Sequence, residues 1–247
     1  MHKMLGAVGA WRDRLLDWLY PEDALCPLCR SERIDGTWLC RWCGDTFPWV
    51  RTPLCPLCGR PVEEEGPCHD CGTAERIFDS GVGAAVYRGE AKAAIRALKY
   101  SGARWHALWM GAMMGERVRV AGMRPECVIP VPLHPHRLKT RGYNQAGLLA
   151  EHAARYLELP LWEDVLMRSV DTPTQTRLGR EERLANMHDA FGLLSSGGVA
   201  GREVLLVDDI MTTGATLEAC AGYLKKAGAI RVDTAVFSIS TGNMDMQ

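Results

Sequence analysis

The chain has 247 residues, which suits one large domain or two modest ones. Its 47% hydrophobic and 24% charged residues exclude wholesale disorder, and a formal net charge of −1 excludes a uniformly basic nucleic-acid binder of the histone kind. The ten cysteines are unevenly placed, because eight lie within residues 26–71. We therefore expect a cysteine-rich N-terminal domain over residues 1–75 and a second domain over residues 76–247.

The N-terminal segment favours a cytoplasmic protein. Its uncharged run, residues 4–11, is shorter than most signal-peptide cores and is followed at once by charges. No apolar run of about 20 residues follows, so we expect no transmembrane segment. Apolar residues at helical spacing predict a short amphipathic helix over residues 5–20, which we expect to pack on the protein itself.

The cysteine-rich segment contains four CxxC pairs, and a reducing compartment makes such pairs metal ligands more often than disulfides. The tetrapeptide CPLC occurs twice, and a second CxxC follows each copy. This repeat favours two structural zinc sites of four thiolates each, which leave no open position for catalysis. A cross-braced arrangement, with the first pair joined to the third, stays open. The sequential grouping is Cys26, Cys29, Cys40 and Cys43 for one site, and Cys55, Cys58, Cys68 and Cys71 for the other.

Beyond residue 79 the pattern alternates between strands and helices. The pattern predicts strands over residues 82–87, 128–131, 204–207 and 230–239, of which 204–207 is a continuous apolar run, although Pro130 argues against a plain central strand. Helical spacing predicts helices at residues 91–98, 145–158 and 220–227. Strands that alternate with helices are typical of an α/β fold with a parallel sheet.

The strongest functional motif follows the strand at residues 204–207. Asp208 and Asp209 stand at its carboxyl end, where open α/β sheets bind ligands. Small residues then open a helix and can turn backbone N–H groups and hydroxyls toward a phosphate; they are Thr212, Thr213, Gly214, Ala215 and Thr216. The carboxylates suit ribose hydroxyls or Mg²⁺. No Gly-Lys-Ser or Gly-Lys-Thr exists, so a P-loop NTPase lacks its triphosphate loop.

Residues 204–216, VLLVDDIMTTGAT, resemble the signature of type I phosphoribosyltransferases, which bind 5-phosphoribosyl 1-diphosphate (PRPP). Further segments narrow the resemblance; they are residues 98–102 (LKYSG), 128–132 (VIPVP), 137–145 (RLKTRGYNQ) and the Thr174–Asn186 region. With the cysteine head they resemble the ComF family of competence proteins over nearly the whole chain. Family members often carry one four-cysteine site, whereas this chain has two, as in a double zinc ribbon.

The resemblance implies a phosphoribosyltransferase-like parallel sheet flanked by helices, with a small zinc-ribbon domain. It implies that Asp208 and Asp209 hold the ribose hydroxyls, that residues 212–216 and Lys99 contact PRPP, and that Mg²⁺ accompanies it. Arg137 and Arg141 become candidate catalytic ligands of the pyrophosphate. Residues 169–188 become a flexible lid over the site.

Two functions remain in competition. The first is an enzyme that transfers the phosphoribosyl group, in a role linked to DNA uptake and natural transformation. The second is a non-catalytic factor in competence that senses PRPP or binds single-stranded DNA. Residues 88–141 contain eleven basic and three acidic residues, and four of the basic ones form one helical stripe: Arg88, Lys92, Arg96 and Lys99. That stripe suits PRPP, single-stranded DNA or both. The acceptor and the oligomeric state leave no sequence signal.

Overall fold

The computed structural model describes residues 25–32, 34, 38–170, 190–195 and 198–241. The chain forms two compact units, Met1–Phe47 and Pro48–Gln247. The second cysteine group thus falls in the same unit as the sheet, and the domain boundary expected at residue 75 stays a prediction. The helix predicted over residues 5–20 lies outside the described residues, as does nearly all of the predicted lid.

Four parallel strands form the sheet of the second unit, in the order β1-β6-β5-β2. Their bounds are β1 Ser80–Val86, β2 Cys127–Pro130, β5 Glu203–Met211 and β6 Arg231–Ile239. The sequence predicted a strand at each of these positions, so the expected parallel α/β fold is confirmed. Strand β2 stands at one end of this order, which explains how Pro130 is accommodated in a strand.

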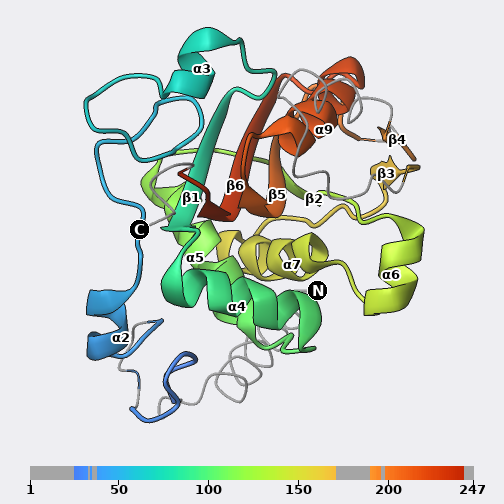
Figure 1. Cartoon of the computed structure of the whole chain (residues 1–247). Coiled ribbons are helices and arrows are strands. Elements are labelled where there is room, and N and C mark those ends of the chain that lie inside the picture. The colour runs from blue at the N-terminus through green and yellow to red at the C-terminus, as the bar shows by residue number, and fades with distance from the viewer. Residues whose placement is uncertain (1–24, 33, 35–37, 171–189, 196–197, 242–247) are drawn as a thin grey trace, which may run out of the picture. The chain divides into compact units, whose positions relative to one another are not determined.

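The helices cover both faces of the sheet, as Figure 1 shows. The long ones are α4 Gly89–Tyr100, α5 His106–Val120, α7 Gln145–Leu157 and α9 Ala215–Lys226. Along β6, Val232 and Val236 join the apolar cluster that contains α9. Phe237 points to the other face and packs against Trp109 of α5, with ring centroids 5.4 Å apart.

Helix α4 buries the predicted face, Ala91, Ala94, Ile95 and Leu98. Helix α5 was not predicted. It packs closely along α7 because two glycines leave room: a Cβ on Gly111 would lie 2.6 Å from the Leu149 carbonyl oxygen, and one on Gly115 would meet Tyr156 at 2.7 Å.

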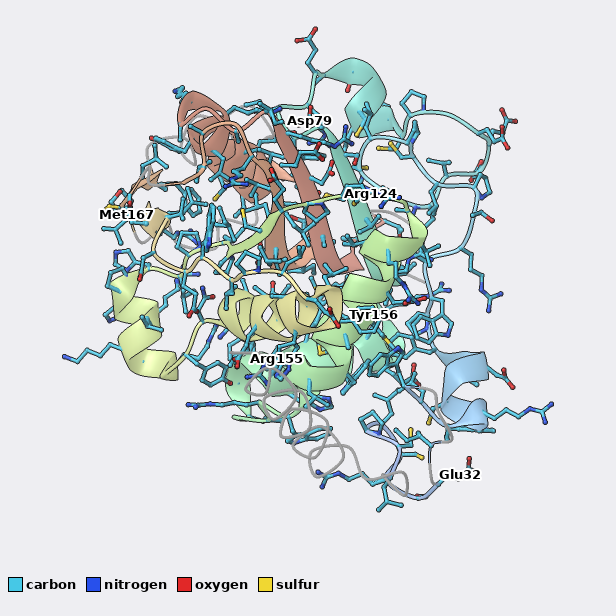
Figure 2. The ribbon with its side chains drawn as sticks, turned by 180° about the vertical axis from the view of Figure 1, so that it is seen from behind. Glu32, Asp79, Arg124, Arg155, Tyr156 and Met167 are labelled. Carbon is cyan, nitrogen blue, oxygen red and sulfur yellow. The ribbon has the colours of Figure 1, made fainter. Side chains whose placement is uncertain are left out.

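Shorter elements complete the second unit: α3 His69–Thr73, α6 Pro135–Arg141, and the antiparallel pair of β3 Leu166–Arg168 with β4 Phe191–Leu193. Figure 2 labels Asp79, just before β1, and Met167 on β3. In the first unit, Cys40 caps helix α2, Arg41–Thr46, where its Sγ accepts the Cys43 N–H at 3.5 Å. Among the described residues, no helix is long and apolar enough to cross a membrane.

Candidate functional site

The acidic pair lies inside strand β5 rather than after it. Pairing of β5 with β2 ends at Val207, opposite Pro130, and β5 continues beside β6 as far as Met211. Asp208 and Asp209 therefore follow the last β2–β5 pair, with side chains on opposite faces. Asp209 is 6% exposed and Asp208 is half-buried. This edge presents two carboxylates in a poorly solvated setting.

Lys99, in the last turn of α4, is the ion partner of Asp209. Its Nζ lies 2.7 Å from Asp209 Oδ2. Burial alone would lower the pKa of Lys99, but the charge and hydrogen bond of Asp209 outweigh it and raise that pKa. The Lys99 ammonium therefore stays charged at neutral pH, and its contact with Asp209 joins α4 to β5 at the carboxyl edge of the sheet.

Among the ion pairs of the described residues, none joins Asp208 to a lysine at hydrogen-bond distance; Lys99 pairs with Asp209 instead. Desolvation, reinforced by the negative charge of Asp209, raises the pKa of Asp208 to about 7, although Lys99 and Arg168 oppose the rise. The charged form of such a carboxylate is stabilised by a ligand that donates hydrogen bonds or carries positive charge. The ribose hydroxyls and divalent cation expected from the sequence are such groups.

The raised pKa of Asp208 makes a testable contribution to stability. Between its ordinary pKa of 3.8 and about pH 7, the folded protein keeps a proton that the unfolded chain has lost, so stability falls as pH rises across this window. Asp208→Asn should remove that loss. In thermal unfolding without ligand, the free energy of unfolding of the variant relative to the parent should increase by about 2 kcal/mol from about pH 5 to about pH 8.

Asp79→Asn is the matched control for this measurement. Burial would raise the pKa of Asp79, but Lys225, 2.6 Å away, and the Val232 N–H outweigh it and lower that pKa. The stability that Asp79 contributes is complete above its unfolded pKa and disappears only as pH falls below it. Its substitution should shift stability equally at both pH values, and the same equal shift for Asp208→Asn would contradict the assignment.

The loop after β5 has the features of a phosphate cradle. Gly214, at the N-cap of α9, has φ of +87°, a left-handed conformation that disfavours other residues. Thr213 Oγ1 accepts the Ala215 N–H at 3.4 Å, and the helix then begins. The first N–H groups of a twelve-residue helix have no intrahelical acceptors, and the helix dipole favours an anion there.

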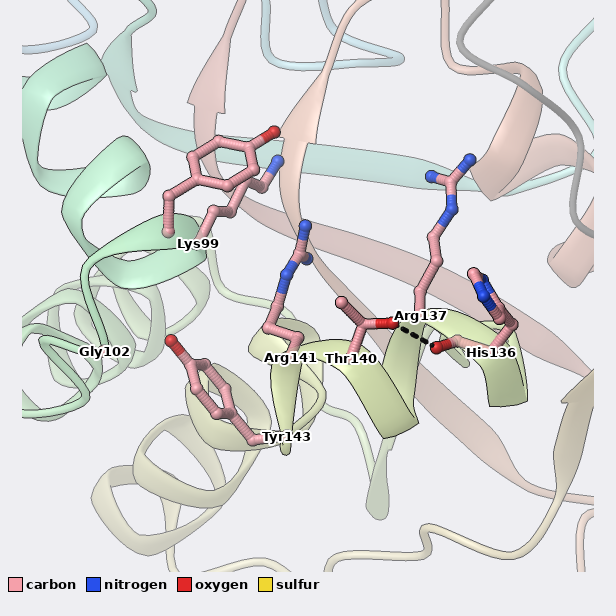
Figure 3. Close-up of a pocket in the computed structure, with 8 residues that line it drawn as sticks. Lys99, Gly102, His136, Arg137, Thr140, Arg141 and Tyr143 are labelled. Carbon is pink, nitrogen blue, oxygen red and sulfur yellow. Dashed lines mark hydrogen bonds between the residues drawn. The ribbon is translucent and has the colours of Figure 1, made fainter.

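A pocket of about 490 Å³ lies beside this edge, between the end of α4 and helix α6. Figure 3 shows Arg137 and Arg141 extending from α6, with Lys99 on the side of α4. The Arg141 guanidinium lies 5.4 Å from the centre of the Tyr100 ring and donates to Gln145 Oε1. The lining residues are Lys99, Tyr100, Gly102, His136, Arg137, Thr140, Arg141 and Tyr143.

Lys99 links the two halves of the predicted site. It pairs with Asp209 and also lines the pocket that contains Arg137 and Arg141. The structure therefore brings the acidic pair and the two arginines, which are more than sixty residues apart in sequence, to one region. The set offers carboxylates for hydroxyls or Mg²⁺, N–H groups for one phosphate and guanidinium groups for another. The chemistry of these groups fits PRPP with Mg²⁺.

The cysteines form two clusters with the sequential grouping, residues 26, 29, 40 and 43 and residues 55, 58, 68 and 71. In each cluster all four sulfur atoms lie within 4.8 Å of one another. The Cys29–Cys40 and Cys58–Cys68 sulfurs are 3.8 and 3.6 Å apart. A tetrahedral ion with Zn–S bonds of about 2.3 Å requires sulfurs about 3.8 Å apart. Both clusters fit structural Zn²⁺.

Comparison with known proteins shows which domains and relatives the chain resembles. Residues 15–72 match the family model of a double zinc ribbon domain, and residues 144–240 match that of a phosphoribosyl transferase domain. The chain is 32% identical to Competence protein F of Haemophilus influenzae, over 82% of this chain and 91% of that protein. It is 32% identical to the DNA utilization protein YhgH of Escherichia coli O157:H7, over 84% and 93%. Identity to Competence protein ComFC of Bacillus subtilis is 28%, over 83% and 90%.

Proposed function

This chain belongs to the ComF family of competence proteins, and on that premise we propose that it binds PRPP with Mg²⁺ and transfers the phosphoribosyl group. The observation that carries the proposal is the position of Lys99. It joins the acidic pair of β5 to the pocket of Arg137 and Arg141. A ligand that needs both halves carries hydroxyls and two separate phosphate groups, as PRPP does.

Each part of the site has a role in this proposal. Asp208 and Asp209 accept hydrogen bonds from the ribose hydroxyls, and the N–H groups at the start of α9 hold the 5′-phosphate. Arg137 and Arg141 bind the pyrophosphate, where guanidinium groups stabilise the negative charge that develops on departure. Mg²⁺, when bound, supplies further neutralisation of the pyrophosphate charge.

The transfer itself needs no covalent intermediate with the protein. A nucleophile of the acceptor bonds to the ribose C1′ while the bond from C1′ to the pyrophosphate oxygen breaks, and the electron pair leaves with pyrophosphate. The chain's contribution is to orient the ribose and to stabilise charge at both ends of that bond. The acceptor's proton passes to solvent.

We also propose that this chemistry serves DNA uptake or DNA use in the cell. Relatives that align over most of both chains carry the names Competence protein F and DNA utilization protein. Those alignments cover 82% and 84% of this chain and 91% and 93% of the two relatives, which supports carrying the role over to this chain.

Pyrophosphate release tests the enzymatic proposal. The purified full chain is incubated with PRPP, Mg²⁺ and a panel of nucleobases and amines, and pyrophosphate is followed with time. We expect release that depends on one acceptor class and that disappears in an Asp208→Asn, Asp209→Asn variant. Release no faster than that variant's with every acceptor would reject transfer. Binding of PRPP without release would leave the non-catalytic function instead.

The non-catalytic alternative, binding of single-stranded DNA, has one structural observation in its favour. A second hollow of about 550 Å³ lies along α4 and is lined by Lys92, Arg96 and Tyr100, among others. Tyr100 is 74% exposed, and an exposed aromatic ring beside cations suits base stacking and phosphate contact together. Lys99 does not belong to this exposed stripe, because it is held by Asp209.

Charge reversal on α4 tests this alternative. Lys92→Glu with Arg96→Glu should weaken binding of labelled single-stranded DNA about tenfold and make its salt dependence shallower. Arg119→Glu with Arg155→Glu is the control, since those exposed arginines pair with Glu116 and Glu151 and lie outside both hollows. Equal losses of DNA affinity in the two variants would show that α4 is not the DNA-binding surface.

A further inference from the structure

We propose that the second cysteine cluster positions the phosphate loop, residues 212–216, through Arg76 and Arg60. The loop would then keep its ligand-binding shape only while the metal site of Cys55, Cys58, Cys68 and Cys71 is intact. This inference rests on the proposed PRPP function, because it assigns the ribbon a part in binding the 5′-phosphate. It concerns positioning residues and no additional catalytic group.

Arg76 connects the cluster to the loop directly. Its Nε donates to Cys71 Sγ at 3.2 Å, and its Nη1 donates to the Thr213 carbonyl oxygen at 3.2 Å. The same Nη1 lies 3.1 Å from Glu218 Oε1, on the first turns of α9. The side chain of Arg76 is only 2% exposed, so these contacts occur in a poorly screened setting where charged hydrogen bonds are strong.

Glu218 fixes the other end of this connection. Its side chain is 6% exposed, and its Oε2 accepts the Ile77 N–H at 2.7 Å. The segment that follows the cluster is thus held to the helix that follows the loop. A carboxylate buried this deeply requires a cation, and Arg76 is its ion partner among the described residues.

Gly214 allows the close approach that the connection needs. A Cβ at this position would lie 2.9 Å from Arg76 Nη1. A side chain at position 214 would therefore displace the guanidinium group from its contact with the Thr213 carbonyl oxygen. The glycine of the phosphate loop is needed for contact with the ribbon as well as for its own conformation.

Arg60, from the middle of the cluster, holds the preceding residue of the loop. Its Nη2 donates to the Thr212 carbonyl oxygen at 2.5 Å, and its Nη1 pairs with Asp70 at 2.9 Å. The ribbon itself sits against the sheet at this point, because a Cβ on Gly59 would meet the Gly81 carbonyl oxygen of β1 at 2.5 Å. Movement of the ribbon would therefore carry Arg60 away from the loop.

Two consecutive carbonyl groups of the loop, those of Thr212 and Thr213, are thus held by guanidinium groups of the ribbon. Carbonyls fixed in this way fix the planes of the peptides that follow, and with them the direction of the next N–H groups. Arg76 Nη2 and Arg60 Nε are buried and have no acceptor among the described residues, so each side chain keeps one N–H donor atom that is not hydrogen-bonded. Cys71, as a ligand of the cluster, would be held in place for Arg76 when zinc is bound.

Arg76→Gln in the zinc-loaded full chain is the central test. We expect its Kd for PRPP, measured by calorimetry with Mg²⁺, to rise about tenfold, as for loss of one charge-assisted contact network. Where turnover is measured, KM for PRPP should rise with kcat within about twofold, because the acidic pair and pocket arginines are untouched. Arg76→Lys should not restore binding, since one ammonium cannot reach all three acceptors.

Arg231→Gln is the matched control. Arg231 also pairs with a deeply buried acid, Asp233, at 2.9 Å, but it opens β6 at the amino edge of the sheet. It should alter thermal stability without altering the Kd for PRPP. Amide hydrogen exchange of residues 212–216 gives a second readout: exchange should accelerate in Arg76→Gln and in zinc-depleted protein, and remain unchanged in Arg231→Gln.

These readouts separate the two proposals. If the parent protein binds no PRPP, the proposed function fails, while exchange of the loop still decides the positioning role. If the parent binds PRPP and Arg76→Gln binds it equally well with unchanged loop exchange, the positioning role is wrong and the function stands. Equal loss of affinity in Arg76→Gln and Arg231→Gln would likewise overturn it, since that reports general destabilisation.

Discussion

Replacing Asp209 with asparagine is expected to weaken PRPP binding by about 100-fold or more, which corresponds to about 2.7 kcal/mol. The change removes the negative charge that ribose hydroxyls would contact, and each hydrogen bond to a charged group contributes about 1.5–3 kcal/mol. It also leaves the Lys99 ammonium without its 2.7 Å partner in a position where only 21% of that side chain is exposed. The first effect acts on the bound state alone, and the second removes the contact that positions a side chain lining the pocket.

The loss should be specific to the site. Asp79→Asn is the control, because it breaks an aspartate–lysine pair of similar length, 2.6 Å to Lys225, at the amino edge of the sheet. Calorimetric titration of PRPP with Mg²⁺ should give the parent affinity for this control. A Kd within about threefold of the parent for Asp209→Asn would contradict the role of Asp209. Circular dichroism of both variants establishes that each is folded.

Asp209→Asn carries a second expected result that a merely destabilised protein would not give. The charge of Asp209 is one cause of the raised pKa of Asp208, second to desolvation. Its removal should therefore lower the pKa of Asp208. The carboxyl carbon chemical shift of Asp208, followed by NMR through its titration, should show a midpoint below about 7 in the variant.

The sheet was predictable from sequence because its strands are buried on both faces. A strand covered by helices on each side often reads as a continuous apolar run, and residues 204–207 do so, whereas residues 230–239 mix apolar residues with Arg231, Asp233, Thr234 and Ser238. The face of α4 followed from helical spacing for a different reason, since only one side of that helix is buried and its apolar residues recur once per turn. Helix α5 is buried on most sides, so its sequence has no single apolar stripe to find.

The acidic pair and the cysteine clusters were predictable because each is local in sequence. A pair of adjacent aspartates and a CxxC repeat can be found without knowing the fold. Arg60, Arg76 and Glu218 carried no such signal. Their contacts join residues 137 to 152 positions apart, so only the packing of the ribbon beside α9 brings them to the phosphate loop.

The two zinc sites should differ sharply in what their loss does to the protein. Cys58→Ser is expected to lower the main unfolding temperature by about 10 °C or more, and Cys43→Ser to change it by less than about 3 °C. Cys58 is 1% exposed, and its cluster packs in one apolar core with Phe78 and residues of β5, β6 and α9. Loss of zinc from this cluster removes a metal cross-link from the core of the larger unit.

Cys43 belongs to the other compact unit, Met1–Phe47, so its loss should unfold little beyond that unit. Both substitutions exchange a buried thiolate for a hydroxyl that binds zinc poorly. Metal analysis should find two zinc ions in the parent, one for each cluster, and one in each variant. If both variants lose the same amount of zinc but only Cys58→Ser lowers the unfolding temperature strongly, the difference is due to where the cluster lies and not to metal loss itself.

The large effect expected at Cys58 follows from how structural zinc contributes to folding. The free energy of zinc binding is free energy of folding, because the unfolded chain does not hold the four thiolates together. In the larger unit that energy is shared with the sheet, since the cluster and α9 lie in one core and the segment after the cluster is tied to α9 by Arg76 and Glu218. Equal temperature shifts for Cys58→Ser and Cys43→Ser would show instead that both ribbons unfold apart from the sheet.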